Sequence, residues 1–171
     1  MYDWELSDDA LKTWVRLRQA WEAVEKALGR ELDRHDATIA QVDVLGVLDA
    51  SKVSLTPGQL SSYTFREQHS ISAQLSRMRK AGLIKKTRSA KDQRVVRINA
   101  TPKGKDSLEE TRQAGLGQAR KLLKAALSGQ ELEQLDKLLK KVRDRALQQL
   151  GMEAEPLPNT FDAAKFLADL T

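Results

Sequence analysis

The stretch GLIKKTRSAKDQRVVRINATPKG, residues 82–104, decides the fold that we expect for this chain. Two short β-favouring runs, LIKKT and RVVRINA, flank the polar segment RSAKDQ, and their alternation predicts an antiparallel hairpin. Thr101 and Pro102 are then expected to cap a helix that runs to about Leu127. The stretch holds seven Lys and Arg against one Asp. The predicted hairpin is therefore a strongly basic ribbon.

The positive charge of the chain is concentrated around this ribbon. Eleven basic residues and one acidic residue lie between Arg77 and Lys105, so this window carries +10 while the whole chain carries +5. The remaining residues must therefore carry a net charge of −5. A basic segment in an otherwise acidic molecule indicates a polyanionic partner, and nucleic acid is favoured over membrane because no apolar amphipathic anchor accompanies the charge. A solvated, lysine-rich surface is the alternative interpretation.

Two short helices are predicted directly before the hairpin. Thr56, Pro57 and Gln59 form a helix start, with Thr56 as the cap. Ser70 is expected to cap the next helix, SISAQLSRMRKAG, which ends at Gly82. The segment FREQH, residues 65–69, joins the two, so together they predict a helix-turn-helix.

Longer helices are predicted at both ends of the chain. One follows Ser7, a shorter one starts at the Thr38–Gln41 capping box, and a last one runs from Ser128 to Gly151. The first and last helices carry apolar residues at spacings of three and four, which predicts packing against other helices. A small DNA-binding core cannot cover these stripes, but a two-fold dimer would bury them. The stripes comprise Trp14, Leu17, Trp21, Val24 and Leu28, and Leu135, Leu139, Val142 and Ala146.

These elements predict a mainly α protein, a winged helix-turn-helix with a two-stranded β-wing and long N- and C-terminal dimerisation helices. Four parts are expected: an N-terminal dimerisation helix (1–36), the DNA-binding domain (37–104), C-terminal dimerisation helices (105–150) and an extension (151–171). The extension follows two prolines and is helix-like, with apolar residues that can dock elsewhere: Phe161, Ala164, Phe166 and Leu167.

The order of elements over residues 7–150 resembles the MarR family of winged-helix transcriptional regulators. The most specific part of the resemblance is a Gly-Leu-Ile/Val start, an Asp-x-Arg tip and a Thr-x-x-Gly helix entry, matched by Gly82, Leu83, Ile84, Asp92, Arg94, Thr101 and Gly104. The chain departs from the family pattern at Ala73, Arg79, Ser89-Ala90, Gln93 and Ala100. These departures concern the sequence of the DNA site and the rigidity of the wing tip rather than the fold.

The second helix of the predicted helix-turn-helix has a solvent face that suits the major groove of B-DNA. Ile71, Leu75 and Met78 would hold it to the core. On the outer face Arg77 is expected to bind guanine, and from a flank Gln74 is expected to bind adenine. The alternative is that the small residues only let the helix approach and contact phosphates. The candidate contacts are Ser70, Ser72, Ala73, Gln74, Ser76, Arg77 and Lys80.

The wing supplies the other candidate DNA contacts, Arg88, Lys91 and Arg94. Asp92 is expected to support the wing by orienting an arginine side chain through a charge-assisted hydrogen bond. The family resemblance further implies that Arg94 or Arg88 enters the minor groove. A surface pair that only stabilises the turn is the alternative role for Asp92 and Arg94.

Catalysis has little support in the sequence. The chain has no cysteine and only two histidines, His35 and His69, and its glycines form no phosphate-binding loop. A regulatory metal site with Asp33, His35 and Asp36 is a minor alternative. We expect no enzyme activity, no cofactor and no metal. No apolar run is long enough for a membrane span and no export signal is present, so a cytoplasmic location is expected.

Two functions remain compatible with the sequence. The first is a homodimeric, sequence-specific regulator that binds double-stranded DNA at a palindromic operator, most often a repressor in the MarR family. The resemblance also implies release by a small, often aromatic, effector, for which Trp14, Trp21 and Tyr63 are the candidate pocket residues. Tryptophans at this spacing equally fit a helix core. The second function is a helical interaction module that binds acidic protein or lipid surfaces without DNA sequence specificity.

Overall fold

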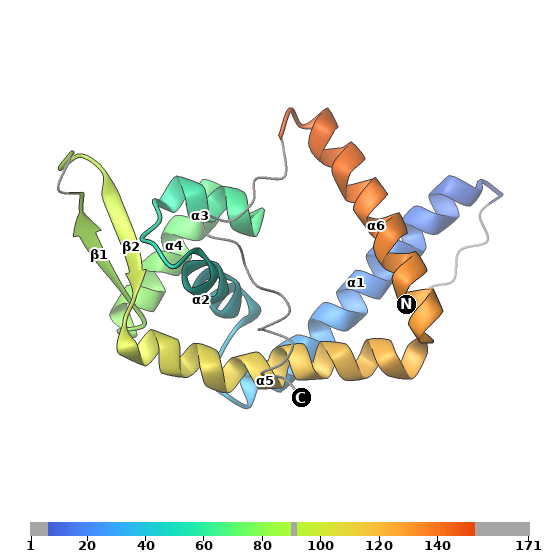
Figure 1. The fold of residues 1–171 in the computed structure, drawn as a ribbon, viewed down its shortest axis with the longest axis horizontal. Helices are drawn as coiled ribbons and strands as arrows, with labels where there is room; N and C mark the ends of the chain where they lie inside the picture. The colour runs from blue at the N-terminus through green and yellow to red at the C-terminus, as the bar shows by residue number, and fades with distance from the viewer. Residues whose placement is uncertain (1–6, 90–91, 153–171) are drawn as a thin grey trace.

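The computed structural model describes residues 7–89 and 92–152. Over these residues the chain forms six α-helices and one two-stranded antiparallel sheet (Figure 1). This confirms the mainly α, winged helix-turn-helix fold expected from the sequence. The elements are α1 (Asp9–Asp33), α2 (Ile39–Ser51), α3 (Pro57–Thr64), α4 (Gln68–Lys80), β1 (Ile84–Arg88), β2 (Val96–Ala100), α5 (Pro102–Ala126) and α6 (Gly129–Gln149).

Side-chain caps set most helix starts where the sequence predicts them. Thr38, Thr56 and Ser128 each accept a hydrogen bond from the backbone N–H three residues on, and the Gln or Glu at that position bonds back to the cap's own N–H. Each of these bonds satisfies a donor that the helix itself leaves unpaired. The three capping boxes are confirmed.

The start of α4 lies earlier than the sequence predicts. The helix begins at Gln68 and its N-cap is Glu67, which makes no side-chain cap bond, so Ser70 lies in the first turn and is not the cap. The reason lies in the preceding turn: Phe65 ends α3 with a left-handed backbone, φ 52°. This conformation turns the chain within about one residue of the end of α3. The next helix, α4, can therefore begin before Ser70, the residue that the sequence offered as its cap.

The wing is the expected hairpin with one additional partner. Ile84 pairs with Ala100 and Arg88 with Val96. Leu55, in the loop between α2 and α3, forms an antiparallel bridge with Ile98 through two backbone hydrogen bonds of 3.2 and 2.7 Å. The sequence did not predict this third strand-like segment, because one bridged residue carries no alternation pattern.

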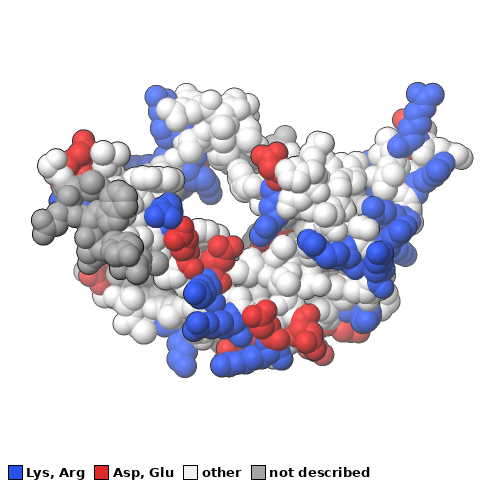
Figure 2. Space-filling view, turned by 180° about the vertical axis from the view of Figure 1, so that it is seen from behind, with Lys and Arg blue, Asp and Glu red and all other residues white. Residues whose placement is uncertain are grey.

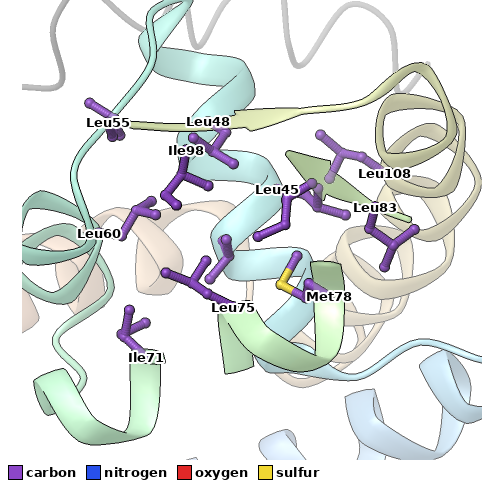
Figure 3. Close-up of a cluster of buried hydrophobic side chains, with 12 residues drawn as sticks. Leu45, Leu48, Leu55, Leu60, Ile71, Leu75, Met78, Leu83, Ile98 and Leu108 are labelled. Carbon is purple, nitrogen blue, oxygen red and sulfur yellow. The ribbon is translucent and has the colours of Figure 1, made fainter. Parts of the chain in front are cut away.

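One hydrophobic core joins α2, α3, α4, the wing and the start of α5 (Figure 3). Ile71, Leu75 and Met78 are fully buried in it, so the apolar face predicted for α4 is confirmed. α5 passes through residue 105 without a break, and its Leu108 belongs to this same core. The predicted boundary between residues 104 and 105 therefore lies inside a continuous helix.

The junction between the wing and α5 explains the Gly-Leu-Ile and Thr-x-x-Gly patterns. The Thr101 hydroxyl donates to the carbonyl of Gly82 (2.6 Å) and accepts from the N–H of Gly104 (3.0 Å). A Cβ on Gly104 would lie 2.1 Å from the carbonyl oxygen of Leu83. Glycine is thus required where α5 packs directly on the backbone at the start of the wing.

The remaining helices form the other end of the molecule. α1 packs most extensively against α5, and α6 turns back from the far end of α5 (Figure 1). Arg112 of α5 binds Asp49 of α2 at 2.9 Å. Partial burial raises the pKa of Asp49, but hydrogen bonds from Lys52 and Arg112 outweigh it and leave the pKa below its ordinary value. Across residues 7–89 and 92–152, no helix is long and apolar enough to cross a membrane.

Candidate nucleic-acid interface

The outer face of α4 presents small and basic side chains beside the wing. Ser70, Ser72, Ala73, Arg77 and Lys80 are exposed, and Ser76 is half-buried. A helix with such a face can approach base edges closely, because no bulky side chain holds it away from the groove. The structure thus brings together on one surface six of the seven residues predicted on this helix.

Gln74 is the exception, because its predicted place on an exposed flank is wrong. The residue is only 6% exposed, and its side-chain oxygen accepts a hydrogen bond of 2.9 Å from Nη2 of Arg77. α4 lies deep enough against the core that the flank next to Met78 is also covered. In this arrangement the Gln74 oxygen is bonded to Arg77, and we do not retain Gln74 as a base contact.

The described part of the wing adds exposed arginines next to α4. Arg88, at the end of β1, and Arg94, in the turn before β2, are both exposed. Lys91 lies outside the described residues. Figure 2 shows Lys and Arg predominating on the wing side of the molecule, at the right of that view. This distribution agrees with the excess of basic residues that the sequence places between Arg77 and Lys105.

Asp92 supports the wing in a different way from the one expected. Its carboxylate accepts a hydrogen bond of 2.9 Å from the backbone N–H of Arg94, and its carbonyl accepts one of 3.0 Å from Val95. The predicted bond from Asp92 to an arginine side chain is not the bond that forms here. A short acidic side chain readily closes such a turn on the backbone two residues on.

The turn of the helix-turn-helix is tied to α2 by a residue that the sequence did not single out. Arg66 lies between α3 and α4, and its Nη2 binds Asp43 of α2 at 3.0 Å. The Ser61 hydroxyl donates to the carbonyl of Arg66 at 2.5 Å. Both contacts hold the turn that sets the angle of α4. The sequence showed only that this segment is polar, because two residues that pair from distant positions in the chain leave no local pattern.

A cavity of about 400 Å³ lies beside this turn. Tyr63 lines it, as expected for a pocket residue, but Trp14 and Trp21 do not. Both tryptophans lie on α1 with 59% of their surface exposed, so of the three candidate pocket residues only Tyr63 lies at the wall of this cavity. The walls come from α2, α3 and α5: Val42, Asp43, Gly46, Val47, Ala50, Tyr63, Thr64, Leu108, Arg112 and Leu116.

The histidines show no arrangement for metal chemistry. In the part of the chain that the structure describes, no group of three or more His, Asp or Glu side chains is placed to hold a metal ion. Asp33, His35 and Asp36 lie at the end of α1 and in the following turn, and all are exposed.

A helix-turn-helix followed by a basic two-stranded wing defines the class of winged helix-turn-helix proteins. A sequence model of the MarR family matches residues 35–95, which cover α2, α3, α4, β1 and most of the wing turn. Over these residues the chain is similar to the MarR family of winged-helix transcriptional regulators. No match is found among curated proteins.

Solved structures share the fold over most of the chain. AbsC, a MarR family regulator from Streptomyces coelicolor, is 20% identical with a TM-score of 0.75, and the match covers 84% of this chain and 97% of AbsC. A mutant MarR from E. coli, solved with operator DNA, is 24% identical with a TM-score of 0.73 over 81% of this chain and 99% of that one. The organohalide-sensing regulator RdhR-CbdbA1625, solved with 2,4-dichlorophenol, is 26% identical with a TM-score of 0.76 over 86% and 89%.

Proposed function

We propose that this protein is a homodimeric repressor that binds a palindromic double-stranded DNA operator and is released by a small aromatic effector. The observation that carries the DNA-binding part is the outer face of α4, where exposed Arg77 and Lys80 stand among small residues beside the basic wing. An α-helix fits the major groove, and a basic ribbon next to it suits the phosphate backbone and the adjacent minor groove. The E. coli MarR structure with operator DNA has the same fold.

Selection of bound duplexes from a random pool tests this proposal. The full chain should enrich one motif with two inverted half-sites centred about one helical turn apart, and its preference should survive excess competitor DNA. If the chain instead bound all duplexes, heparin and anionic vesicles with similar, steeply salt-dependent affinity, it would be the non-specific polyanion-binding module.

The two-fold part of the proposal rests on apolar surface. On α1, Leu11, Trp14 and Trp21 are exposed, and on α6, Leu138, Leu139 and Val142 are exposed. Over the described residues, α6 makes no extensive contact with another element of its own chain. Two helices with uncovered apolar stripes at one end of the molecule suit a second copy that covers them.

Sedimentation of the full chain at micromolar concentration should therefore give twice the mass of one chain. Val142→Glu places a charge in the expected contact and should shift the protein toward the monomer. Lys137→Glu on the same helix is the control, because Lys137 is exposed and its ammonium pairs only with exposed Glu133 one turn earlier in α6 among the contacts seen here. This substitution should leave the dimer intact. A folded wild-type monomer at these concentrations would contradict the dimer and the palindromic operator.

The effector part rests on the cavity beside the helix-turn-helix turn. Its volume suits a small ligand, and its walls combine apolar side chains with Tyr63, Asp43 and Arg112. Asp43 also holds Arg66, so a ligand that moves Asp43 would disturb the turn that positions α4. The likeness to a regulator solved with 2,4-dichlorophenol supports an aromatic ligand.

Thermal unfolding with 2,4-dichlorophenol and with benzoate as probes tests this site. A ligand at about 100 times its Kd should stabilise the protein by about 2.7 kcal/mol and should weaken DNA binding in parallel. Val47→Phe, which fills part of the cavity, should abolish the stabilisation and keep DNA binding. Stabilisation that survives in Val47→Phe would place the ligand elsewhere.

A further inference from the structure

We propose that Gln74 is a positioning residue of the DNA-binding surface, which holds the guanidinium of Arg77 at one edge of α4 and thereby sharpens the base preference of that arginine. The proposal rests on the DNA-binding function proposed above. It assigns Gln74 a role that acts through Arg77 and needs no contact of its own with DNA.

The bond between the two side chains joins the core to the exposed surface. Gln74 is buried, Arg77 is exposed, and Nη2 of Arg77 donates to the Gln74 oxygen at 2.9 Å. Core packing restricts the rotamers of a buried side chain, so this acceptor lies at a fixed place. The exposed arginine is thus attached at one end to an immobile group.

The turn of the helix explains why Gln74 can do this. At about 100° per residue, Gln74 lies about 40° from buried Met78 on one side and about 60° from Arg77 on the other. It therefore occupies the border between the apolar face and the outer face. Residues three apart are neighbours on a helix surface, so the pair forms without distorting α4.

The bond leaves Arg77 able to read a base. A guanidinium has five N–H donors, and the bond to Gln74 uses one of them. A bidentate contact to guanine needs two donors in a defined plane. Gln74 holds the plane of the guanidinium before DNA binds, so less side-chain entropy is lost on binding. For one immobilised side chain this saving corresponds to about a two- to tenfold change in affinity.

Gln74→Met tests the role of the acceptor. Methionine is unbranched, of similar length and suited to buried sites, but its thioether is a poor acceptor. A first measurement on Arg77→Ala identifies the base pair at which that variant loses its preference. The experiment then measures the ratio of two affinities, one for the selected duplex and one for a duplex changed at this base pair. In the Gln74→Met protein this ratio should fall about two- to tenfold per protomer. Gln74→Glu keeps an acceptor for Arg77, so it should retain most of the ratio even if the added charge weakens binding to every duplex.

A double-mutant cycle separates positioning from a structural role. In an Arg77→Ala background, Gln74→Met should not lower the affinity for the selected duplex further, because the group that Gln74 positions is gone. An equal loss of affinity for the selected duplex in both backgrounds, or an unchanged ratio in the Arg77 background, would overturn the proposal. Thermal unfolding of each variant shows whether it folds, and Gln74→Leu, which also lacks an acceptor, carries the test if Gln74→Met does not fold.

Failure of the proposed function gives a different result from failure of the positioning role. A wild-type protein that prefers no duplex contradicts sequence-specific binding itself. A wild-type protein with a clear motif whose base preferences are identical in Gln74→Met contradicts only the role of Gln74.

Discussion

Replacing Gly104 with alanine should destabilise the protein although it improves helix propensity. The added Cβ would lie 2.1 Å from the carbonyl oxygen of Leu83 and 3.2 Å from a methyl group of Leu45. Relief requires the wing start and α5 to separate by about 1 Å, since this oxygen is backbone and cannot rotate away. Overpacking of this kind costs about 1–3 kcal/mol, which exceeds the gain of up to about 1 kcal/mol from Gly to Ala in a helix.

Gly117→Ala in the same helix is the matched control. A Cβ at Gly117 meets no atom within 4 Å, so only the helix propensity changes and the variant should gain about 0.5–1 kcal/mol. Thermal unfolding of both variants at one protein concentration measures the contrast. A difference of about 2 kcal/mol corresponds to about 4–8 °C in Tm for a chain of this size. If Gly104→Ala were as stable as Gly117→Ala, the direct packing of α5 on the wing would be refuted.

Two further predictions concern DNA binding and pH. Arg77→Ala should reduce preference for the selected duplex by about 1–3 kcal/mol, whereas Arg94→Ala should weaken binding to all duplexes and lower the salt slope by about 0.9 for each phosphate that the protein no longer neutralises. Isotherms on selected and scrambled duplexes across a salt series measure both, and the reverse pattern would mean that the roles of α4 and the wing are exchanged. The pKa of Asp49 is lower in the folded protein than in the unfolded chain, where it is near 4. Ionised Asp49 therefore stabilises the fold at pH values above the unfolded pKa, and this stabilisation is lost as the pH falls through the folded pKa. Urea unfolding should therefore give Asp49→Asn a lower free energy of unfolding than wild type at pH 7, and this difference should shrink below about pH 4. A difference that does not depend on pH would contradict the Asp49–Arg112 ion pair as its source.

Local chemistry in the sequence was sufficient to predict the order of the elements. Capping residues such as Thr38, Thr56 and Ser128 act within one turn, and their effect is visible without knowledge of the fold. The wing was equally visible, because two β-favouring runs with a short polar connection have one obvious way to pair. The basic character of the surface follows from composition alone, since charged side chains seldom leave the surface unpaired.

The tertiary structure decided how deeply each residue is buried and which residues from distant segments it contacts. Helical periodicity gives the direction of Gln74 around α4 but not the depth to which the helix is buried, and this depth turned an expected base contact into a partner of Arg77. The Leu55 bridge, the Arg66–Asp43 pair and the cavity walls likewise join segments far apart in the chain. Such contacts arise only when the core closes, because no short-range propensity distinguishes the residues that will meet across it.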